Sequence, residues 1–298
     1  MNSTMKHTAA DRIKTARKRS YWGEIWHRMR QNKSAMVGLG ILAALLLVLM
    51  FSFFFIDYAQ VTAINTAEQM KPPSAAHPFG TDGLGRDLFS RVLYGTRYSL
   101  VIGVVSVAIS LAVGTALGAL AGYFGGKLEE VIMRLSDVLA SIPAMLLGMV
   151  IVTVLGQSLQ NLIFAVGVTA IPAFTRIARS SVLTIRDQEF VQSAKAIGMS
   201  HARIIFTQVL PNGLSPIIVT TTGRIGACII EAASLSYLGF GVPSPMPEWG
   251  ALISEGRNFI RSAAYMTLFP GLFIMITVLA FNLLGDGLRD ALDPKLKK

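Results

Sequence analysis

Two ionisable residues, Arg224 and Glu231, lie inside a long apolar segment between residues 214 and 238. They are seven residues apart, so an α-helix would place them on one face, about two turns from each other. A charged side chain at the centre of a bilayer costs roughly 2.5–3.5 kcal/mol, so we expect neither residue to face lipid. The pair can line a water-filled pathway or bind a polar solute, or it can be a structural pair or contact a neighbouring helix.

The sequence contains no motif for covalent catalysis or nucleotide hydrolysis. It has neither a Gly-x-x-x-x-Gly-Lys-Ser/Thr loop nor a Gly-x-Ser-x-Gly elbow. Cys228 is the only cysteine, so no disulfide or thiolate metal site can form within the chain. The histidines have no pair at helical metal-ligand spacing: His7, His27, His77 and His201. We therefore expect no catalytic, cofactor-binding or metal-binding residue.

The composition indicates that the elements carrying Arg224 and Glu231 lie in a membrane. Hydrophobic residues make up 52% of the 298 residues, charged residues 15%, and the mean hydropathy is +0.54. A helix of about 20 apolar residues crosses the hydrocarbon core of a bilayer. We predict an all-α membrane protein with six spans, at residues 35–56, 100–121, 131–155, 159–174, 214–238 and 267–284. Five spans is the alternative, because Pro143 lies in the third span and Pro172 in the fourth.

The distribution of positive charge predicts the orientation, because cytoplasmic loops retain lysine and arginine. With six spans, 20 of the 27 Lys and Arg residues fall on the side of the two termini and six on the other side. We therefore expect both termini in the cytoplasm. The resulting division is a basic tail (1–34), a first transmembrane helix (35–56), an extracytoplasmic loop (57–97), a transmembrane core (98–286) with a cytosolic loop (176–211), and a cytoplasmic tail (287–298).

The basic N-terminal tail has two interpretations. Its cluster of cations, Lys14, Arg17, Lys18 and Arg19, is of the kind that binds nucleic acid. Positive charge before a first span also sets topology and binds anionic lipid headgroups, and we expect this role and no nucleic acid. Trp22 and Trp26, close to Arg28 and Arg30, predict a short amphipathic helix at the membrane surface.

Small side chains recur every fourth residue along the second span, at Ser106, Ser110, Gly114, Gly118 and Gly122. In lipid, helices associate through close backbone approach, which small residues allow. This face is either an interface in a moving bundle, including one with a second subunit, or a static contact inside the chain.

The polar segment between the fourth and fifth spans predicts a helix, a sharp turn and a second helix. Residues 187–197 have apolar positions at helical spacing, and Gly198 can adopt the left-handed conformation that a turn requires. Ser200 can cap a second helix that ends before Pro211. Such a protrusion suits docking into a soluble partner, and the alternative is a passive amphipathic loop on the bilayer.

This segment resembles the EAA loop of the membrane subunits of ABC importers. That loop reads Glu-Ala-Ala, three residues, Gly, nine residues, Ile, one residue, Leu-Pro. The matching positions here are Gln192, Ser193, Ala194, Gly198, Gln208, Leu210 and Pro211. Gln192, Ser193 and Gln208 differ from the family pattern, so an ionic contact from the first position is not expected.

Further segments are similar to the peptide/nickel class of these permeases, especially the dipeptide permease "C" subunits. They lie between residues 33 and 294 and include Phe79-Gly80-Thr81-Asp82, Gly85-Arg86-Asp87, Ser90-Arg91, Leu238-Gly239-Phe240-Gly241, Pro247-Glu248-Trp249-Gly250, Phe269-Pro270-Gly271 and residues 282–290. The resemblance implies the six-span type I permease fold, a bacterial cytoplasmic (inner) membrane location, and import of di- or oligopeptides. Nickel or another small solute is the alternative.

The same resemblance implies partners for each surface. A related second permease subunit would complete the pathway, two cytosolic ATPases carrying ATP and Mg would drive it, and an extracytoplasmic binding protein would deliver solute. The residues implied to couple to the ATPases are Gln192, Ser193, Ala194, Gly198, Leu210 and Pro211. Candidate contacts for the binding protein are Asp82, Arg86, Asp87, Glu248 and Trp249, although Asp82 and Asp87 can equally be turn and helix-cap residues.

Two other classes of protein fit the sequence less well. A secondary transporter or channel could use Arg224 and Glu231 as an ion or proton site. The sequence has no clear inverted repeat, and a passive carrier needs no helix-turn-helix on its cytosolic face. A non-transporting membrane scaffold is the third possibility, and dependence of uptake on ATP separates the importer from both.

Overall fold

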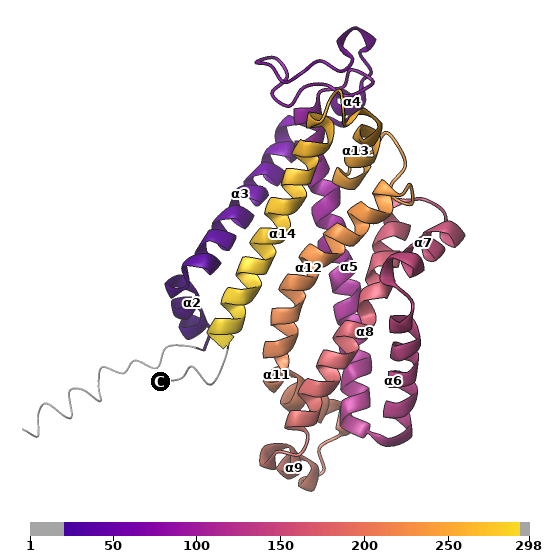
Figure 1. The fold of residues 1–298 in the computed structure, drawn as a ribbon. Coiled ribbons are helices and arrows are strands. Elements are labelled where there is room, and N and C mark those ends of the chain that lie inside the picture. The colour runs from indigo at the N-terminus through magenta and orange to yellow at the C-terminus, as the bar shows by residue number, and fades with distance from the viewer. Residues whose placement is uncertain (1–20, 293–298) are drawn as a thin grey trace, which may run out of the picture.

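The computed structural model describes residues 21–292, and these form an elongated bundle of helices (Figure 1). The α-helices are α2 (Tyr21–Gln31), α3 (Lys33–Phe55), α4 (Tyr58–Thr62), α5 (Leu88–Phe124), α6 (Gly126–Ser141), α7 (Ala144–Leu155), α8 (Leu159–Ile185), α9 (Glu189–Ala196), α10 (His201–Ile204), α11 (Leu210–Asn212), α12 (Leu214–Tyr237), α13 (Trp249–Gly256) and α14 (Tyr265–Leu292). Short 3-10 turns, η1 (Thr66–Glu68) and η3 (Arg257–Phe259), and a π-helical turn, η2 (Ile205–Val209), complete the elements.

Five helices are long and apolar enough to cross a membrane: α3, α5, α8, α12 and α14. They lie side by side, with α14 between α3 and α12, and with α5 packed along α8 (Figure 1). The prediction of an all-α membrane protein is therefore confirmed, because each of these helices coincides to within one residue with a predicted apolar run or includes it. Of the shorter helices, α4 and α13 lie at one end of the bundle and α9 and α11 at the other, whereas α6 packs along α8 (Figure 1).

The third predicted span, residues 131–155, is wrong as a single helix. The chain forms α6 and α7 instead, and the two axes are bent by 90° at the break between them. Pro143 causes the break, because a proline lacks the backbone N–H that would continue the helix and disfavours a helical conformation in the residue before it. The structure thus has five continuous candidate spans, or six if the bent pair counts as one.

Several helices are longer than the apolar runs that predicted them. The second begins twelve residues early, at Leu88, so the outer loop is shorter than 57–97. The helix expected to end at residue 174 runs to Ile185, which places the first part of the predicted 176–211 loop inside α8. The last helix continues to Leu292, beyond the boundary expected at residue 286. Hydropathy locates the apolar part of a helix, whereas its polar ends depend on packing and capping.

The small-residue face of α5 packs inside the chain, against α8. A Cβ atom at Gly114 would lie 2.6 Å from Phe174 Cβ and 2.8 Å from the Ile171 carbonyl oxygen. Ser106 Oγ donates a hydrogen bond to the Ile163 carbonyl, at 2.9 Å. The face is therefore buried in a contact inside the chain, as the second interpretation expected, and in this conformation it is not exposed to a second subunit.

The predicted amphipathic helix before the first span is α2. Its apolar residues Ile25 and Met29 are buried against Leu284, Leu288, Ala291 and Leu292 at the end of α14. Asn32 Nδ2 donates a hydrogen bond to Asp290 Oδ2, at 2.9 Å. Trp26 is exposed and Arg30 lies over its ring, with Cζ 5.1 Å from the ring centroid. The cluster Lys14–Arg19 and His7 lie outside the described residues.

Candidate functional site

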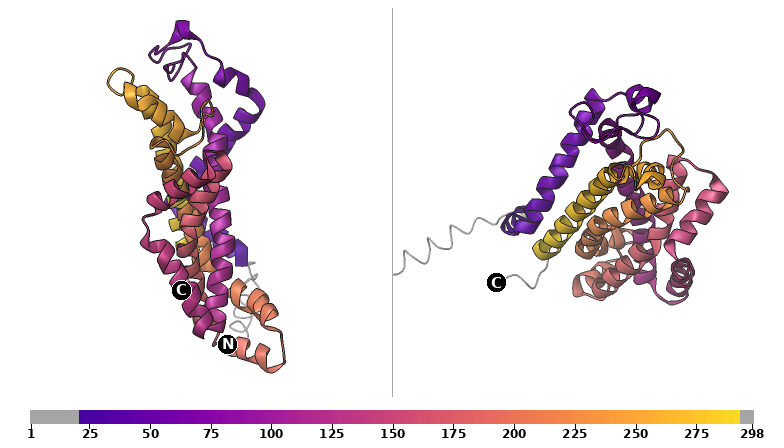
Figure 2. Two further views of the ribbon diagram at one scale, coloured as in Figure 1. Left: turned by 90° about the vertical axis from the view of Figure 1, so that its right-hand side faces the viewer. Right: turned by 45° about the horizontal axis from the view of Figure 1, so that its top comes forward.

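The chain between α8 and α12, residues 186–213, projects from one end of the bundle (Figure 2). We call this segment the connecting loop. It contains α9, a turn at Gly198, α10, η2 and α11. Gly198 has φ +79°, and the Met199 N–H donates to the Ala194 carbonyl, at 3.1 Å, across the turn. The predicted helix, left-handed turn and second helix are therefore present. The turn forms at Gly198 because glycine, which has no Cβ atom, adopts a positive φ without a steric clash.

The second helix of the connecting loop differs from the prediction at both ends. Ser200 lies at the N-cap of α10, but its side chain makes no capping hydrogen bond to that helix. The helix does not end before Pro211: the chain passes through the π turn of η2 into α11 and stops at Gly213. Pro211 supplies no N–H and would crowd the carbonyl one turn earlier, and a wider π turn relieves that crowding.

One face of the connecting loop is buried and the other is exposed. Val191, Ala194, Ile204, Ile205 and Val209 pack against Ala119, Tyr123, Val182 and Ile185 at the ends of α5 and α8. On the outer face Gln192, Ser193 and Pro211 are exposed, as is Ile197 (78%). Phe206 is also exposed (71%), but it lies on the side that faces α5 and α12. Leu210 is half-buried. Exposed apolar side chains on a protruding loop provide contact area for a partner.

The end of α5 contacts the connecting loop through three polar interactions that sequence reasoning missed. The Tyr123 hydroxyl lies 3.0 Å from His201 Nδ1, and Lys195 Nζ lies 5.4 Å from the centroid of the Tyr123 ring. Arg186 Nη1 donates to the Gly122 carbonyl, at 2.8 Å. The partners are 64 and 78 residues apart in the two hydrogen-bonded pairs, so no local pattern could reveal them.

Arg224 and Glu231 do not pair with each other within the 4 Å distance of an ion pair in the described part of the chain. Glu231 Oε1 accepts a hydrogen bond from Thr169 Oγ1 of α8, at 2.8 Å. Arg224 is half-buried and makes no hydrogen bond or ion pair with another residue of the range 21–292. Glu231 thus makes the polar contact with a neighbouring helix that the sequence allowed.

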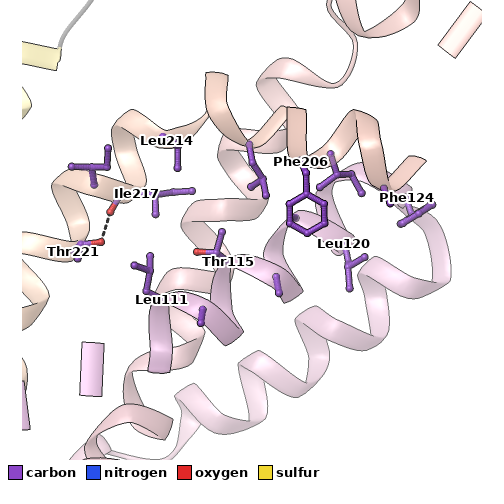
Figure 3. A pocket seen from close by; sticks show the side chains of 15 residues that line it. Leu111, Thr115, Leu120, Phe124, Phe206, Leu214, Ile217 and Thr221 are labelled. Carbon is purple, nitrogen blue, oxygen red and sulfur yellow. Dashed lines mark hydrogen bonds between the residues drawn. The ribbon is translucent and has the colours of Figure 1, made fainter. Parts of the chain in front are cut away.

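An apolar cavity of about 530 Å³ lies between α5, the connecting loop and α12 (Figure 3). Its lining includes Leu111, Leu120 and Phe124 of α5 and Leu214 and Ile217 of α12, with Ile205 and Phe206 of the π turn. Two hydroxyls lie in it. Thr221 Oγ1 donates to the Ile217 carbonyl, at 2.8 Å, whereas Thr115 Oγ1 is buried without a hydrogen-bond partner among the described residues.

At the opposite end of the bundle, the five predicted contacts for a binding protein are mostly internal. Asp82, Arg86, Glu248 and Trp249 are each at least 96% buried. Asp87 caps α5, because its side chain accepts from the Ser90 N–H, at 2.8 Å. Glu248 caps α13 in the same way. Direct contact with a docking protein needs exposed side chains, so these four buried residues do not provide it in this conformation. Asp87 is a cap residue and Asp82 a turn residue, as the alternative interpretation expected.

Asp82 and Arg86 belong to a buried ionic cluster that also contains Arg91 and Glu255. Asp82 Oδ2 accepts from Arg86 Nε, at 2.7 Å, and from Arg91 Nη1, at 2.5 Å. Glu255 Oε2 accepts from Arg86 Nη2, at 2.8 Å, and from Arg91 Nη1, at 2.6 Å. Two cations and two anions balance each other, which offsets the cost of removing them from water. The cluster connects the outer loop and α5 to α13.

Comparison with known proteins assigns most of the chain to two family models. Residues 114–298 match the binding-protein-dependent transport system inner membrane component, and residues 20–73 match the N-terminal TM domain of oligopeptide transport permease C. The dipeptide transport system permease protein DppC of Alkalihalophilus pseudofirmus is 46% identical over 280 residues, which is 93% of this chain and 91% of the relative. The glutathione transport system permease protein GsiD of Salmonella paratyphi A is 46% identical over 285 residues, 96% of this chain and 94% of the relative.

A solved structure of the MetNI methionine ABC transporter, in an inward-facing conformation, has the same fold. Its matching chain superposes with a TM-score of 0.58 over 69% of this chain and 98% of that chain, at 19% sequence identity. The predicted ABC importer permease fold is therefore confirmed at the level of the helical core. The chain belongs to the family of binding-protein-dependent transport system inner membrane components, the permease subunits of ABC importers.

Proposed function

We propose that this protein is a permease subunit that imports short peptides into the cytoplasm through a bacterial inner membrane. The observation that carries the proposal is the near-full-length identity of 46% to two relatives, one named for dipeptide and one for glutathione transport. Glutathione is itself a short peptide, so the two relatives share one chemical class of solute. No observation favours nickel over a peptide.

In this proposal both termini and the connecting loop face the cytoplasm. The excess of lysine and arginine on that side supports the orientation, since 20 of the 27 such residues lie there when the bent α6–α7 pair counts as one span. The connecting loop is the docking element for the ATPases, of which the complex has two, and these hold ATP and Mg. The exposed residues of the loop, Gln192, Ser193, Ile197 and Pro211, support this role because a partner can reach them. Ala194 is buried, and it contributes by packing the loop against the bundle.

Arg224 is the proposed contact for solute in the pathway. It is the half-buried cation of a candidate membrane span and makes no ion pair within residues 21–292. A guanidinium without a carboxylate partner can bind the C-terminal carboxylate of a peptide. Glu231 lies about two turns beyond Arg224 on α12 and accepts a hydrogen bond from Thr169 of α8. Its carboxylate can bind the peptide amino group.

The remaining partners follow from the family. A homologous but different permease subunit forms the other half of the pathway, and an extracytoplasmic binding protein docks at the end of the bundle that carries α4 and α13 (Figure 1). The buried ionic cluster supports this docking indirectly, because it keeps the outer loop and α13 in one arrangement. The exposed apolar side chains of α3, such as Leu47, Phe54 and Phe55, are available to lipid.

Purification and reconstitution test the proposal. The chain is purified in mild detergent with its associated proteins, placed in liposomes, and assayed for uptake of a labelled dipeptide, with glutathione and nickel as comparison solutes. We expect a second permease and P-loop ATPases to copurify, and peptide uptake to require ATP and a binding protein. Uptake by the chain alone without ATP would instead establish a secondary transporter, and ATP-driven uptake of nickel alone would exclude the peptide assignment.

A further inference from the structure

The last turn of α5 carries a side chain that contacts both arms of the connecting loop. Lys195, before the turn at Gly198, lies over the Tyr123 ring with its Nζ 5.4 Å from the centroid. His201, after that turn, lies 3.0 Å from the Tyr123 hydroxyl through Nδ1, and its ring meets the Tyr123 ring edge-on at 5.7 Å between centroids. Tyr123 is only 8% exposed, so the contacts are made inside the loop and not on its docking face.

The opposite end of α5 is fixed in the buried ionic cluster. Asp87 caps the helix, and Arg91, in its first turn, is 0% exposed and bonded to Asp82 and Glu255. Between the two ends, α5 is a continuous helix of 37 residues without an internal proline, about 55 Å long. One rigid element therefore joins the connecting loop at one end of the bundle to α13 at the other (Figure 1).

We propose that Tyr123 is a positioning residue that transmits displacement of the connecting loop to α5 through its hydrogen bond to His201. The inference rests on the proposed function, since it assumes that ATPases move this loop. Movement of the loop pulls on the end of α5, and because α5 is one unbroken helix without a proline, the displacement reaches Arg91 and the residues bonded to it. Sites joined by a rigid element with two arrangements are coupled in this way.

The role of the Tyr123 hydroxyl can be tested separately from the packing of the Tyr123 ring. The ring fills space among Ala119, Val182 and Ala194, which phenylalanine would also fill. Arg186 Nη1 still bonds the Gly122 carbonyl without the hydroxyl, so the loop stays attached to α5. Tyr123→Phe therefore removes the hydrogen bond to His201 and leaves the contacts with Lys195 and the apolar cluster in place.

The test measures peptide uptake and ATP hydrolysis together in the reconstituted complex. We expect Tyr123→Phe to keep the ATPases bound and to lower uptake per ATP hydrolysed by about fivefold, the effect of one ordinary hydrogen bond. His201→Leu should lower the ratio at least as much, because it removes the same hydrogen bond and also the ring contacts of His201 with Tyr123 and Phe124. The double variant should be no worse than His201→Leu alone, because the hydroxyl of Tyr123 then has no partner left to lose. Tyr237→Phe is the matched control, since its hydroxyl bonds no residue of the range 21–292, and it should leave the ratio unchanged.

An unchanged ratio in Tyr123→Phe overturns the inference, even if both rates fall together. Loss of the ATPases from the purified Tyr123→Phe complex also overturns it, because the hydroxyl would then serve assembly. Effects of Tyr123→Phe and His201→Leu that add in the double variant would show that the two side chains act separately, which overturns it as well. ATP-driven uptake by the wild type is measured first, and its absence would count against the proposed function and not against this residue alone.

Discussion

Arg91 and Glu255 form a two-bond ion pair between α5 and α13, although 164 residues separate them in the chain. Arg91 Nη1 lies 2.6 Å from Glu255 Oε2, and Nη2 lies 3.2 Å from Oε1. Arg91 also contacts Asp82, and its own side chain is fully buried. The pair thereby ties the start of the 37-residue helix α5 to the short helix after α12.

Replacing Arg91 should destabilise the protein. Arg91→Met leaves Asp82 and Glu255 with Arg86 as the one cation of the cluster, and breaking a buried ion pair costs about 3–5 kcal/mol. We expect a lower midpoint of thermal unfolding for the purified protein in detergent. Arg134→Met is the control, because that side chain is 78% exposed and lies 3.5 Å from Glu130, and it should change the free energy of unfolding by less than about 0.5 kcal/mol. Equal midpoints for the two variants would contradict the structural role of the cluster.

Gly198→Val should weaken the association with ATPases while leaving membrane insertion intact. No atom of the described residues lies within 4 Å of a Cβ at this position, so the effect comes from φ +79°, which a β-branched residue strongly disfavours. The amount of ATPase that copurifies with the variant measures this association. Gly198→Asn provides the control, because asparagine tolerates this conformation and should retain most of the ATPase. Full ATPase binding and normal transport in Gly198→Val would argue against a docking role for the connecting loop.

Arg224→Met should lower ATP-driven peptide uptake by about tenfold or more, since it removes a charged hydrogen bond to solute. Glu231→Gln should lower it in the same direction. Initial rates in liposomes provide the measurement. Thr220→Val on the same helix is the control, because its hydroxyl bonds the Pro216 carbonyl of its own helix, at 2.8 Å, and uptake should be unchanged. If both charge variants transported at the wild-type rate, Arg224 and Glu231 would not belong to the pathway.

Gly114→Ala should destabilise the contact between α5 and α8. The added methyl group would lie 2.6 Å from Phe174 Cβ, and overpacking of this kind costs about 1–3 kcal/mol. Gly40→Ala on α3 is matched in chemistry, but no atom of the range 21–292 lies within 4 Å of its Cβ, so it should be neutral or slightly stabilising through helix propensity. Thermal unfolding compares the two, and a destabilised Gly40→Ala with an unaffected Gly114→Ala would show that the contact is not tight.

The outer loop should contribute stability that depends on pH. Hydrogen bonding from Lys71 lowers the pKa of the Glu68 carboxyl, with further contributions from the charges of Lys71 and His77. A carboxyl whose pKa is lower in the folded state stabilises that state above its unfolded pKa, and the contribution is lost as the pH falls through the folded pKa. Glu68→Gln should therefore unfold at a lower temperature than wild type at neutral pH, with the difference shrinking in acid.

Lys71→Met is the companion variant for this measurement. Lys71 Nζ lies 3.1 Å from Glu68 Oε1 and is the main cause of the lowered pKa. In a protein that already carries Lys71→Met, adding Glu68→Gln should therefore change the unfolding temperature less than it does in the wild type, and the remaining change comes from His77 and Asn65, which also contact Glu68. If the difference in unfolding temperature between wild type and Glu68→Gln stayed constant from neutral to acidic pH, the charged carboxylate of Glu68 would not stabilise the folded state through this contact.

The membrane spans and the turn of the connecting loop were predictable because their causes are local. An apolar run such as residues 35–56 needs only its own length and composition to favour a helix in lipid, and it became α3. The left-handed turn at Gly198 depends on the φ angle of one residue. The same locality explains the error at residues 131–155, where average hydropathy hid the effect of Pro143 on the backbone.

The roles of the polar residues were decided only by the tertiary structure. Asp82 and Arg86 lie in an outer loop, where the sequence predicted exposed contacts for a partner. In the structure they are buried, because they pair with Arg91 and Glu255 in a neutral cluster. The recurrence of small residues on α5 predicted a close helix contact but not which helix would make it, and in the structure that helix is α8. Tyr123 carried no signal at all, because its partner His201 is 78 residues away. Pairing and burial depend on side chains that only folding brings together. The sequence alone therefore determined where the apolar parts of the five long helices lie in the chain, and packing determined which of their charges face one another.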